Sequence, residues 1–200
     1  MAGACMQPID DVATLFEYQR AIRAFSDRPV DDATVREVLR AAMHAPSSQN
    51  AQPWRFIVVR DPAQKAAMSE AYEECFLKVY GEGAPARADG RMPWTKVPVL
   101  IVCCVSVPGG RSNIATGASV YPAVQNLMLR ARSLGLGTVL TTLFRLQRDR
   151  FHEMLGIPAE WEAAAIVPLG WPDRNYGPNR RPPVETVVMY DRWTEPDPNL

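Results

Sequence analysis

Polar side chains gather in residues 45–54, a segment that joins a predicted amphipathic helix to a predicted apolar strand. Asn50 and Gln52 each carry amide donors and an acceptor, so they can bind a ligand edge that offers both. Two prolines restrict the backbone and hold these groups in set directions. Local composition alone favours an ordinary connection that anchors Trp54 in the core, and the other motifs of the chain turn the interpretation toward a binding loop. The candidate contacts are Pro46, Ser47, Ser48, Asn50 and Gln52.

Arginines occur at two places where they could bind an anion. Arg20 and Arg23 lie near the N-terminus, and the pair Arg180–Arg181 precedes two prolines near the C-terminus. A guanidinium group matches a phosphate through paired N–H donors, so either place is suited to a phosphate. Taken alone, the pair Arg180–Arg181 is better explained as a solvated turn.

The sequence does not arrange side chains for nucleophilic or metal catalysis. His44 and His152 lie in predicted helices, and the chain lacks the Gly-x-Ser-x-Gly motif of serine hydrolases. Its four cysteines form no Cys-x-x-Cys pair, so we expect no metal site. Glycine motifs of dinucleotide-binding and P-loop proteins are absent as well. This pattern favours an organic cofactor that carries the chemistry while the protein binds and orients it.

Composition limits the class of protein. The 200 residues predict a single domain over residues 1–200, and a hydrophobic fraction of 47% suffices for a core. The 22 basic and 22 acidic residues balance, which argues against a nucleic-acid or membrane-surface partner. The N-terminus lacks the pattern of a signal peptide, and the longest apolar run, 97–107, is too short to span a bilayer as a helix. We expect a soluble cytoplasmic protein.

Helices alternate with apolar strands along the chain, which predicts an α+β fold with a sheet covered by helices. The first helix begins at Asp10 or Asp11 and should bury Val12, Phe16 and Ile22. Small residues crowd the start of the longest helix, so it is a candidate for a subunit interface. Further helices are expected from Asp31 to about 45, from Pro62, from 112 to 134 and from 147 to 155, with strands at 54–59, 98–105, 138–143, 163–169 and 184–190.

Two long connections stand outside these elements. Residues 81–96 contain three glycines and two prolines and predict either a lid loop over a binding site or a disordered surface excursion. Residues 171–200 predict an extended C-terminal arm, because a proline-rich stretch separates the β-prone segment 184–190 from the body. Such a strand can pair with a second subunit.

Five motifs, taken in order, resemble the nitroreductase family of flavin mononucleotide (FMN) enzymes. The resemblance runs from about Phe16 to the C-terminus and implies a nitroreductase-like three-layer α/β/α sandwich with a central mixed sheet. It also implies a homodimer whose C-terminal arms are exchanged between subunits. The motifs are Gln19–Phe25, Pro46–Trp54, Asn126–Leu129 with Leu134–Thr138, Pro168–Pro172 and Arg180–Pro183.

The resemblance assigns roles to residues at matching positions. Arg20 would meet the FMN phosphate, Arg23 the pyrimidine end of the ring, and the loop at 46–52 would flank the ring partly across the dimer interface. Backbone amides near Thr141 and Thr142 would face the redox-active nitrogen. Other residues would complete the phosphate site or shape the substrate side from the lid, although core packing is an alternative for Tyr72 and Phe76. The implied cofactor contacts include Ala21, Gly170, Arg180 and Arg181, and the implied substrate contacts are Tyr72, Phe76 and Trp94.

The function that the resemblance implies is that of a flavoprotein oxidoreductase. It would take hydride from NADH or NADPH and pass it, by ping-pong turnover, to an electron-poor acceptor such as a nitroaromatic or a quinone. One alternative is an oxygen-using relative that processes flavin. Another is a flavin or deazaflavin binding module without useful turnover, which the departures from the family's usual Arg and Ser at Gln19 and Ala21 favour. A hydrolase is a more distant alternative.

Overall fold

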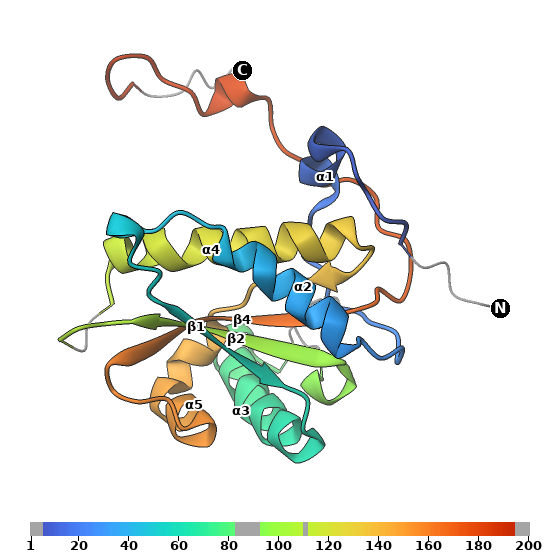
Figure 1. Ribbon diagram of the computed structural model, residues 1–200, viewed down its shortest axis with the longest axis vertical. Coiled ribbons are helices and arrows are strands. Elements are labelled where there is room, and N and C mark those ends of the chain that lie inside the picture. The colour runs from blue at the N-terminus through green and yellow to red at the C-terminus, as the bar shows by residue number, and fades with distance from the viewer. Residues whose placement is uncertain (1–5, 83–92, 110–111, 195–200) are drawn as a thin grey trace.

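The computed structural model describes residues 6–82, 93–109 and 112–194 and forms three layers (Figure 1). Helices α2 and α4 cover one face of a four-stranded sheet, and α3 and α5 cover the other (Figure 1). The α+β class and the α/β/α sandwich are therefore confirmed. The elements are α1 Val12–Tyr18, α2 Asp32–Met43, β1 Trp54–Val59, α3 Pro62–Tyr80, β2 Val99–Ser106, α4 Ile114–Ser133, β3 Gly137–Thr138, α5 Arg148–Leu155 and β4 Trp161–Gly170.

The sheet has the strand order β1-β2-β4-β3, and every pair of neighbouring strands is antiparallel. A mixed sheet was expected from the sequence. Among the described residues, the parallel pairing is limited to one bridge between Ala21 and Thr138 at the β3 edge. The pairing is short because α1 ends at Tyr18, only three residues before Ala21, and the chain after Ala21 turns toward a second, antiparallel bridge between Phe25 and Pro172.

The centre of the core is β2, which is buried on both faces. Ile101 and Cys103 pack among residues of α2 and α4, whereas Val102 and Cys104 pack on the side of α3 and α5. This confirms that the adjacent cysteines point to opposite faces and act as small hydrophobic side chains. Burial raises the pKa of the Cys104 thiol to about 11, so it stays protonated and unreactive at neutral pH.

Helix α1 ends earlier than the sequence indicated. Val12 and Phe16 are 62% and 57% exposed, and Ile22 is buried but lies beyond the helix. The expectation of one buried face on a longer helix was therefore wrong. The reason is a tertiary bond: the backbone N–H of Ile22 donates to the carbonyl of Thr138 at 2.8 Å, which extends the chain after Tyr18.

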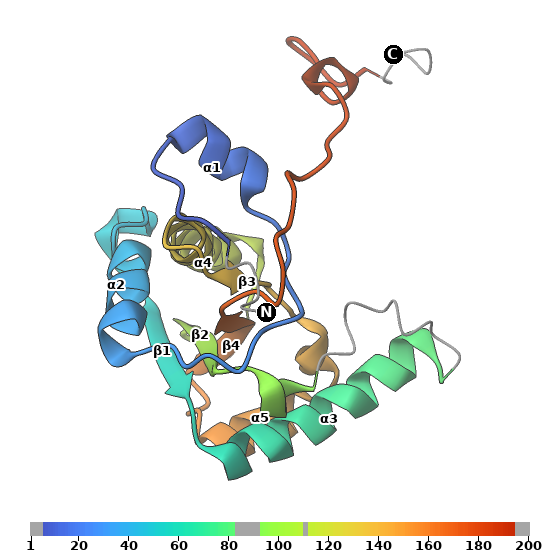
Figure 2. The ribbon, with the colours of Figure 1, turned by 90° about the vertical axis from the view of Figure 1, so that its right-hand side faces the viewer.

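The C-terminal arm leaves the body as an extended segment (Figure 2). The strand expected at 184–190 is absent; residues Val184–Thr186 form a 3₁₀ turn instead. A β-prone segment forms a ladder only beside a strand edge, and within the part of the chain that is described no strand pairs with it. Its apolar side chains Val184, Val187, Tyr190 and Trp193 are exposed.

Helix α4, with 20 residues, is the longest helix in the described part of the chain, and it packs along α2. No helix within the described ranges, α4 included, combines the length and the apolar character needed to cross a membrane.

Of the expected lid loop at 81–96, residues 83–92 lie outside the described residues, and Trp94 at its far end is fully buried.

Candidate functional site

The arginine segment near the N-terminus is held as an extended strand beside β3. Ala21 forms the parallel bridge with Thr138, and Ile22 donates to the Thr138 carbonyl. Since successive side chains of an extended chain point to opposite sides, burial of Ile22 directs Arg23 away from the core packing around it. Arg23 is half-buried and Arg20 is exposed. Both guanidinium groups are thus carried by a backbone that the sheet fixes.

The arm brings the C-terminal arginines back to this segment. The N–H of Asn179 donates to the carbonyl of Glu17 at 2.7 Å, and its side-chain amide donates to Phe16 and Gln19 carbonyls at 2.9 and 3.2 Å. Arg20 in turn donates to the carbonyl of Gly177 at 3.3 Å. These bonds place Arg180 and Arg181, both exposed, beside residues about 160 positions earlier. An open groove of about 660 Å³ lies here, lined by Phe16, Glu17, Gln19, Gln125, Pro178, Asn179 and Arg181.

Tyr72 and Thr141 form the second part of the site. The Tyr72 hydroxyl lies 2.9 Å from Oγ1 of Thr141, and the Thr141 backbone pairs with Ile166 in β4. Burial raises the pKa of Tyr72, and the Thr141 hydrogen bond and the positive charge of Arg23 offset part of that rise. Thr142 follows as an exposed residue.

The three expected substrate contacts are all buried. Tyr72 stacks on Trp94 with ring centroids 4.2 Å apart, and Phe76 packs against Tyr80 at 4.8 Å. In this conformation Phe76 and Trp94 serve the core of the α3 layer. Tyr72 also belongs to that core, but its hydroxyl reaches Thr141.

The loop at 46–52 is strained and stabilised by its own side chains. Gln49, Asn50 and Gln52 have positive φ values of 53°, 55° and 49°. Oγ of Ser47 accepts from the Gln52 N–H at 3.0 Å, and the Gln52 side chain donates to Oδ1 of Asn50 at 3.3 Å. A left-handed conformation at a non-glycine residue costs on the order of 1–3 kcal/mol and is concentrated at functional sites. The conformation therefore supports the interpretation of a binding loop.

Within one chain this loop lies far from the arginine segment. The N–H of Ser48 donates to Oγ of Ser119 near the start of α4, at 3.3 Å, whereas Thr138 follows the other end of that helix. Ser119 and Ser133 are fourteen positions apart in α4, which at 1.5 Å per residue is on the order of 20 Å. Figure 1 shows the two regions at opposite ends of α4. The expected cofactor contacts thus form two groups, and one chain does not bring them together.

Gly170 has a packing role at the end of β4. It pairs with Gly137, and a Cβ atom at Gly170 would lie 2.8 Å from Cδ of Pro98. At Gly137 a Cβ atom would lie 2.7 Å from Cγ2 of Ile22. The two glycines therefore allow the arginine segment to approach the sheet closely.

Sequence reasoning missed two residues that position the site. Asn179 ties the arm to the end of α1, and Ser119 ties the loop to α4. In the sequence, Ser119 is only one of several small residues near the start of α4, and Asn179 directly precedes the pair Arg180–Arg181. Their partners are backbone groups distant in sequence, so no local pattern indicates either bond.

Comparison with known proteins agrees with the fold and the motifs. The Nitroreductase family model matches residues 17–171. An NADH dehydrogenase of Thermus thermophilus is 33% identical over 202 residues, which covers 92% of this chain and 97% of that protein. A 5,6-dimethylbenzimidazole synthase of Rhodospirillum rubrum is 29% identical over 176 residues, 82% of each chain.

A solved structure shows the same fold. Oxidized iodotyrosine deiodinase, bound to FMN and 3-iodo-L-tyrosine, matches with a TM-score of 0.74 at 23% identity, over 92% of this chain and all of that chain. Together with the family match over more than three-quarters of the sequence, these findings show that the chain belongs to the nitroreductase family of oxidoreductases.

Proposed function

We propose that this protein is an FMN-dependent oxidoreductase that takes hydride from NADH or NADPH and delivers it to an electron-poor acceptor such as a nitroaromatic or a quinone. The observation that carries the proposal is the convergence of Arg20 with the 177–181 segment, on a backbone that the Ala21–Thr138 bridge fixes beside β3. The relative named as an NADH dehydrogenase supports the donor. The FMN-bound structure with the same fold supports the cofactor.

The residues present fit FMN. Arg20, Arg180 and Arg181 are exposed cations gathered at one place, as a phosphate requires. Arg23 follows a segment that pairs with β3, and the backbone of Thr141 pairs with Ile166 in β4, where the ring would be held. Bound FMN would supply the two-electron chemistry that no side chain here can supply.

The protein's own groups would bind, orient and exclude water. The hydroxyl of Tyr72 keeps its proton at neutral pH because burial raises its pKa, so it can hold Thr141 in one orientation by hydrogen bonding. The stacked rings of Tyr72 and Trp94 close the α3 side against water. Arg23 places a positive charge near the same hydroxyls, which favours negative charge on a bound ring.

We propose that a second copy of the chain completes the site. The loop at 46–52 is on the order of 20 Å from the arginine segment of its own chain, so it contacts the same cofactor only if it comes from a partner. A homodimer also gives a cover for the exposed apolar side chains of α1 and of the arm. Each of its two sites would then combine the arginine segment of one subunit with the loop of the other.

The alternative function is an oxygen-using reaction on flavin. The similarity to a protein named as 5,6-dimethylbenzimidazole synthase shows that relatives of this chain are not all named as nitroreductases or NADH dehydrogenases. A flavin or deazaflavin binding module is a further alternative, since Gln19 and Ala21 leave fewer phosphate ligands than the family usually has.

The visible absorption spectrum of the purified protein, recorded anaerobically before and after addition of NADH or NADPH, tests these functions. We expect an FMN spectrum that bleaches with the donor and returns when a nitroaromatic or quinone is added. An FMN spectrum that persists under excess donor would favour the oxygen-using reaction or the binding module. A protein that remains colourless after reconstitution with FMN would contradict the proposal.

A further inference from the structure

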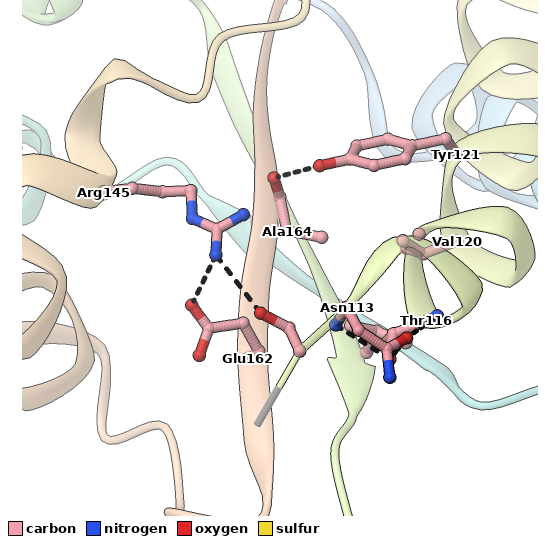
Figure 3. Close-up of a pocket in the computed structure, with 10 residues that line it drawn as sticks. Asn113, Thr116, Val120, Tyr121, Arg145, Glu162 and Ala164 are labelled. Atoms are coloured by element: carbon pink, nitrogen blue, oxygen red, sulfur yellow. Dashed lines mark hydrogen bonds and ion pairs between the residues drawn. The ribbon is translucent and has the colours of Figure 1, made fainter. Parts of the chain in front are cut away.

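A small pocket lies at the end of the sheet remote from Gly170. It is formed by the start of β4, the first turns of α4 and the 3₁₀ turn Leu143–Gln147, and has a volume of about 150 Å³ (Figure 3). Glu162 on its wall and Gly170 are eight residues apart on one strand, about 26 Å at 3.3 Å per residue. The pocket is therefore separate from the arginine segment and from the FMN site proposed above.

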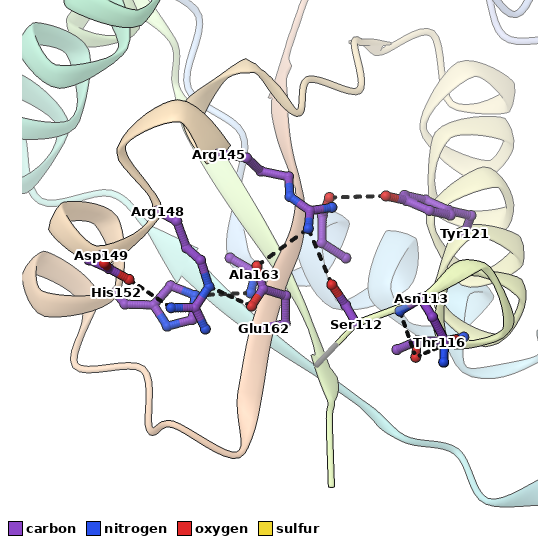
Figure 4. A network of polar contacts seen from close by, with 11 residues as sticks. Ser112, Asn113, Thr116, Tyr121, Arg145, Arg148, Asp149, His152, Glu162 and Ala163 are labelled. Carbon is purple, nitrogen blue, oxygen red and sulfur yellow. Dashed lines mark hydrogen bonds and ion pairs between the residues drawn. The ribbon is translucent and has the colours of Figure 1, made fainter. Parts of the chain in front are cut away.

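Glu162 is a buried carboxylate with one unused oxygen. Its side chain is only 4% exposed, and Oε2 accepts from Nε of Arg148 at 2.7 Å (Figure 4). Within the described part of the chain, Oε1 accepts no hydrogen bond. Nη2 of Arg145 lies 3.7 Å from it, which is too long for a hydrogen bond, and instead donates to Oγ of Ser112 at 3.2 Å.

An unsatisfied buried acceptor is costly and rare in folded proteins. Glu162 lines the pocket, and Oε1 is the one of its two carboxylate oxygens that lacks a hydrogen-bond donor among the described residues. The other polar groups there already have partners: Asn113 and Thr116 bond each other in a helix cap, and the Tyr121 hydroxyl donates to the Ala164 carbonyl. Among the described residues of the pocket, one acceptor, Oε1 of Glu162, therefore still needs a hydrogen-bond donor.

A β-bulge in β4 lies beside the pocket. Cys103 pairs with Ala165 and Cys104 with Ala163, so Ala164 is an extra residue in β4 without a partner across the ladder. Such a bulge changes the direction of neighbouring side chains and is common beside binding sites. Figure 3 shows Tyr121 and Arg145 reaching toward β4 from opposite sides at this point.

The charges around the pocket favour a neutral ligand. Glu162 and Asp149 carry two negative charges, and Arg145 and Arg148 carry two positive charges in ion pairs with them. A charged ligand would upset this balance in a partly buried place. The size of the pocket suits a single ring, because a 150 Å³ cavity accommodates benzene. Val105, Val120, Ala164 and Tyr121 form the apolar part of its lining.

We propose that this pocket binds a neutral, single-ring aromatic molecule that carries one O–H or N–H donor, of the phenol class. Its ring lies between Val120 and Ala164, and its donor hydrogen-bonds to Oε1 of Glu162. The binding is distinct from acceptor binding over a flavin, since none of the residues that would hold the cofactor lines this pocket.

Phenol and benzene are the probes, titrated into the purified protein with its retained cofactor while backbone amide resonances are followed. We expect saturable shifts at Thr116, Val120 and Ala164, with phenol bound roughly three- to tenfold more tightly than benzene because only phenol supplies the hydrogen bond. Absence of saturable shifts, or phenol shifts confined to residues 20–23 and 138–142, would overturn the proposal. A crystal soaked in phenol that shows only water at Oε1 would do the same.

Two variants test the pocket itself. Val120→Phe fills it from α4 and should abolish the phenol shifts; if this variant fails to fold, Val120→Ile gives a graded loss. Glu162→Gln should lower the ratio of phenol to benzene affinity toward one, whereas Glu153→Gln, an exposed change of equal charge, should leave that ratio unaltered. Phenol binding that survives a folded Val120→Phe protein, or an unchanged ratio in Glu162→Gln, would contradict the assignment.

Discussion

The hydroxyl of Tyr72 on α3 lies 2.9 Å from Oγ1 of Thr141, and this contact joins the buried α3 layer to the strand edge beside the arginine segment. The N–H of Leu143 also points to Oγ1 of Thr141, at 3.4 Å. Thr141 is therefore oriented from two directions. If FMN binds as proposed, the Tyr72–Thr141 pair fixes the protein surface that faces the flavin ring.

Tyr72→Phe should remove the hydrogen bond that orients Thr141. The substitution removes one partner of a part-buried hydrogen bond, which costs about 1–2 kcal/mol of unfolding free energy, and we expect slower reduction of the bound flavin by NADH. Denaturant titration and stopped-flow reduction measure the two effects. Tyr80→Phe, at a position 59% exposed, is the matched control and should change neither. Identical reduction rates in Tyr72→Phe and the unaltered protein would remove Tyr72 from the site.

Arg23→Ala should lower the rate of flavin reduction more than it lowers stability. The charge of Arg23 lowers the pKa of the Tyr72 hydroxyl, and loss of a favourable charge interaction of about 1.4 kcal/mol in the transition state slows the step roughly tenfold. Arg40→Ala on the exposed face of α2 provides the control for loss of one positive charge. Equal reduction rates in the Arg23→Ala and Arg40→Ala proteins would refute the role given to Arg23.

Local sequence patterns correctly predicted the elements whose boundaries depend on residues within the element or directly beside it. Trp54–Val59 is rich in β-branched and aromatic residues, and Asp61–Pro62 supplies a cap and a first-turn proline, so both boundaries agree with the structure. Helix α1 and the segment 184–190 differ because their conformations depend on remote partners. Ile22 is extended by Thr138, and residues 184–190 have no strand beside them within the described chain.

The candidate site was predictable in its residues but not in its arrangement. The motifs identified Arg20, Arg23 and the loop at 46–52, while the bonds of Asn179 and Ser119 that place them run to residues far away in sequence. Nor could spacing along the chain reveal that α4 separates the loop from the arginine segment.

Gln49→Gly should relieve strain in the binding loop. Gln49 adopts a φ of 53° and its side chain is exposed, so glycine removes a steric cost that the extra flexibility of the unfolded chain partly offsets. We expect an unfolding free energy unchanged or raised by up to about 1 kcal/mol. Gln49→Val should lower it, because a β-branched residue tolerates positive φ poorly. A glycine variant less stable than the valine variant in denaturant titration would show that the loop is not strained.

If the chain forms the proposed homodimer, a chain that stops at Pro183 should be a monomer. The cut removes Val184, Val187, Tyr190 and Trp193, which are exposed in one chain, but keeps Asn179 and its bonds to α1. Light scattering should report the mass of one chain for this protein, and of two chains for a control shortened only by residues 195–200. A dimer that survives the longer cut would place the interface on α1 and α4 without the arm.

Acid should destabilise the fold through His152. The imidazole is buried, and its Nε2 accepts from the N–H of Ala163 at 3.4 Å, so the neutral form is the one that fits. Burial lowers the pKa of His152 below its usual value of 6.5, and the charge of Arg148 lowers it further. The unfolded chain therefore binds the proton more readily than the folded chain, which makes the contribution of His152 to stability complete above pH 6.5 and smaller as the pH falls below it.

Unfolding free energies measured between pH 8 and pH 5 test this dependence. We expect a decline below about pH 6.5 that is shallower in His152→Gln, since glutamine can accept the Ala163 hydrogen bond without titrating. His44→Gln, on the exposed end of α2, is the matched control and should follow the unaltered protein. If His152→Gln shows the same decline as the unaltered protein, carboxylates and not His152 account for the acid sensitivity.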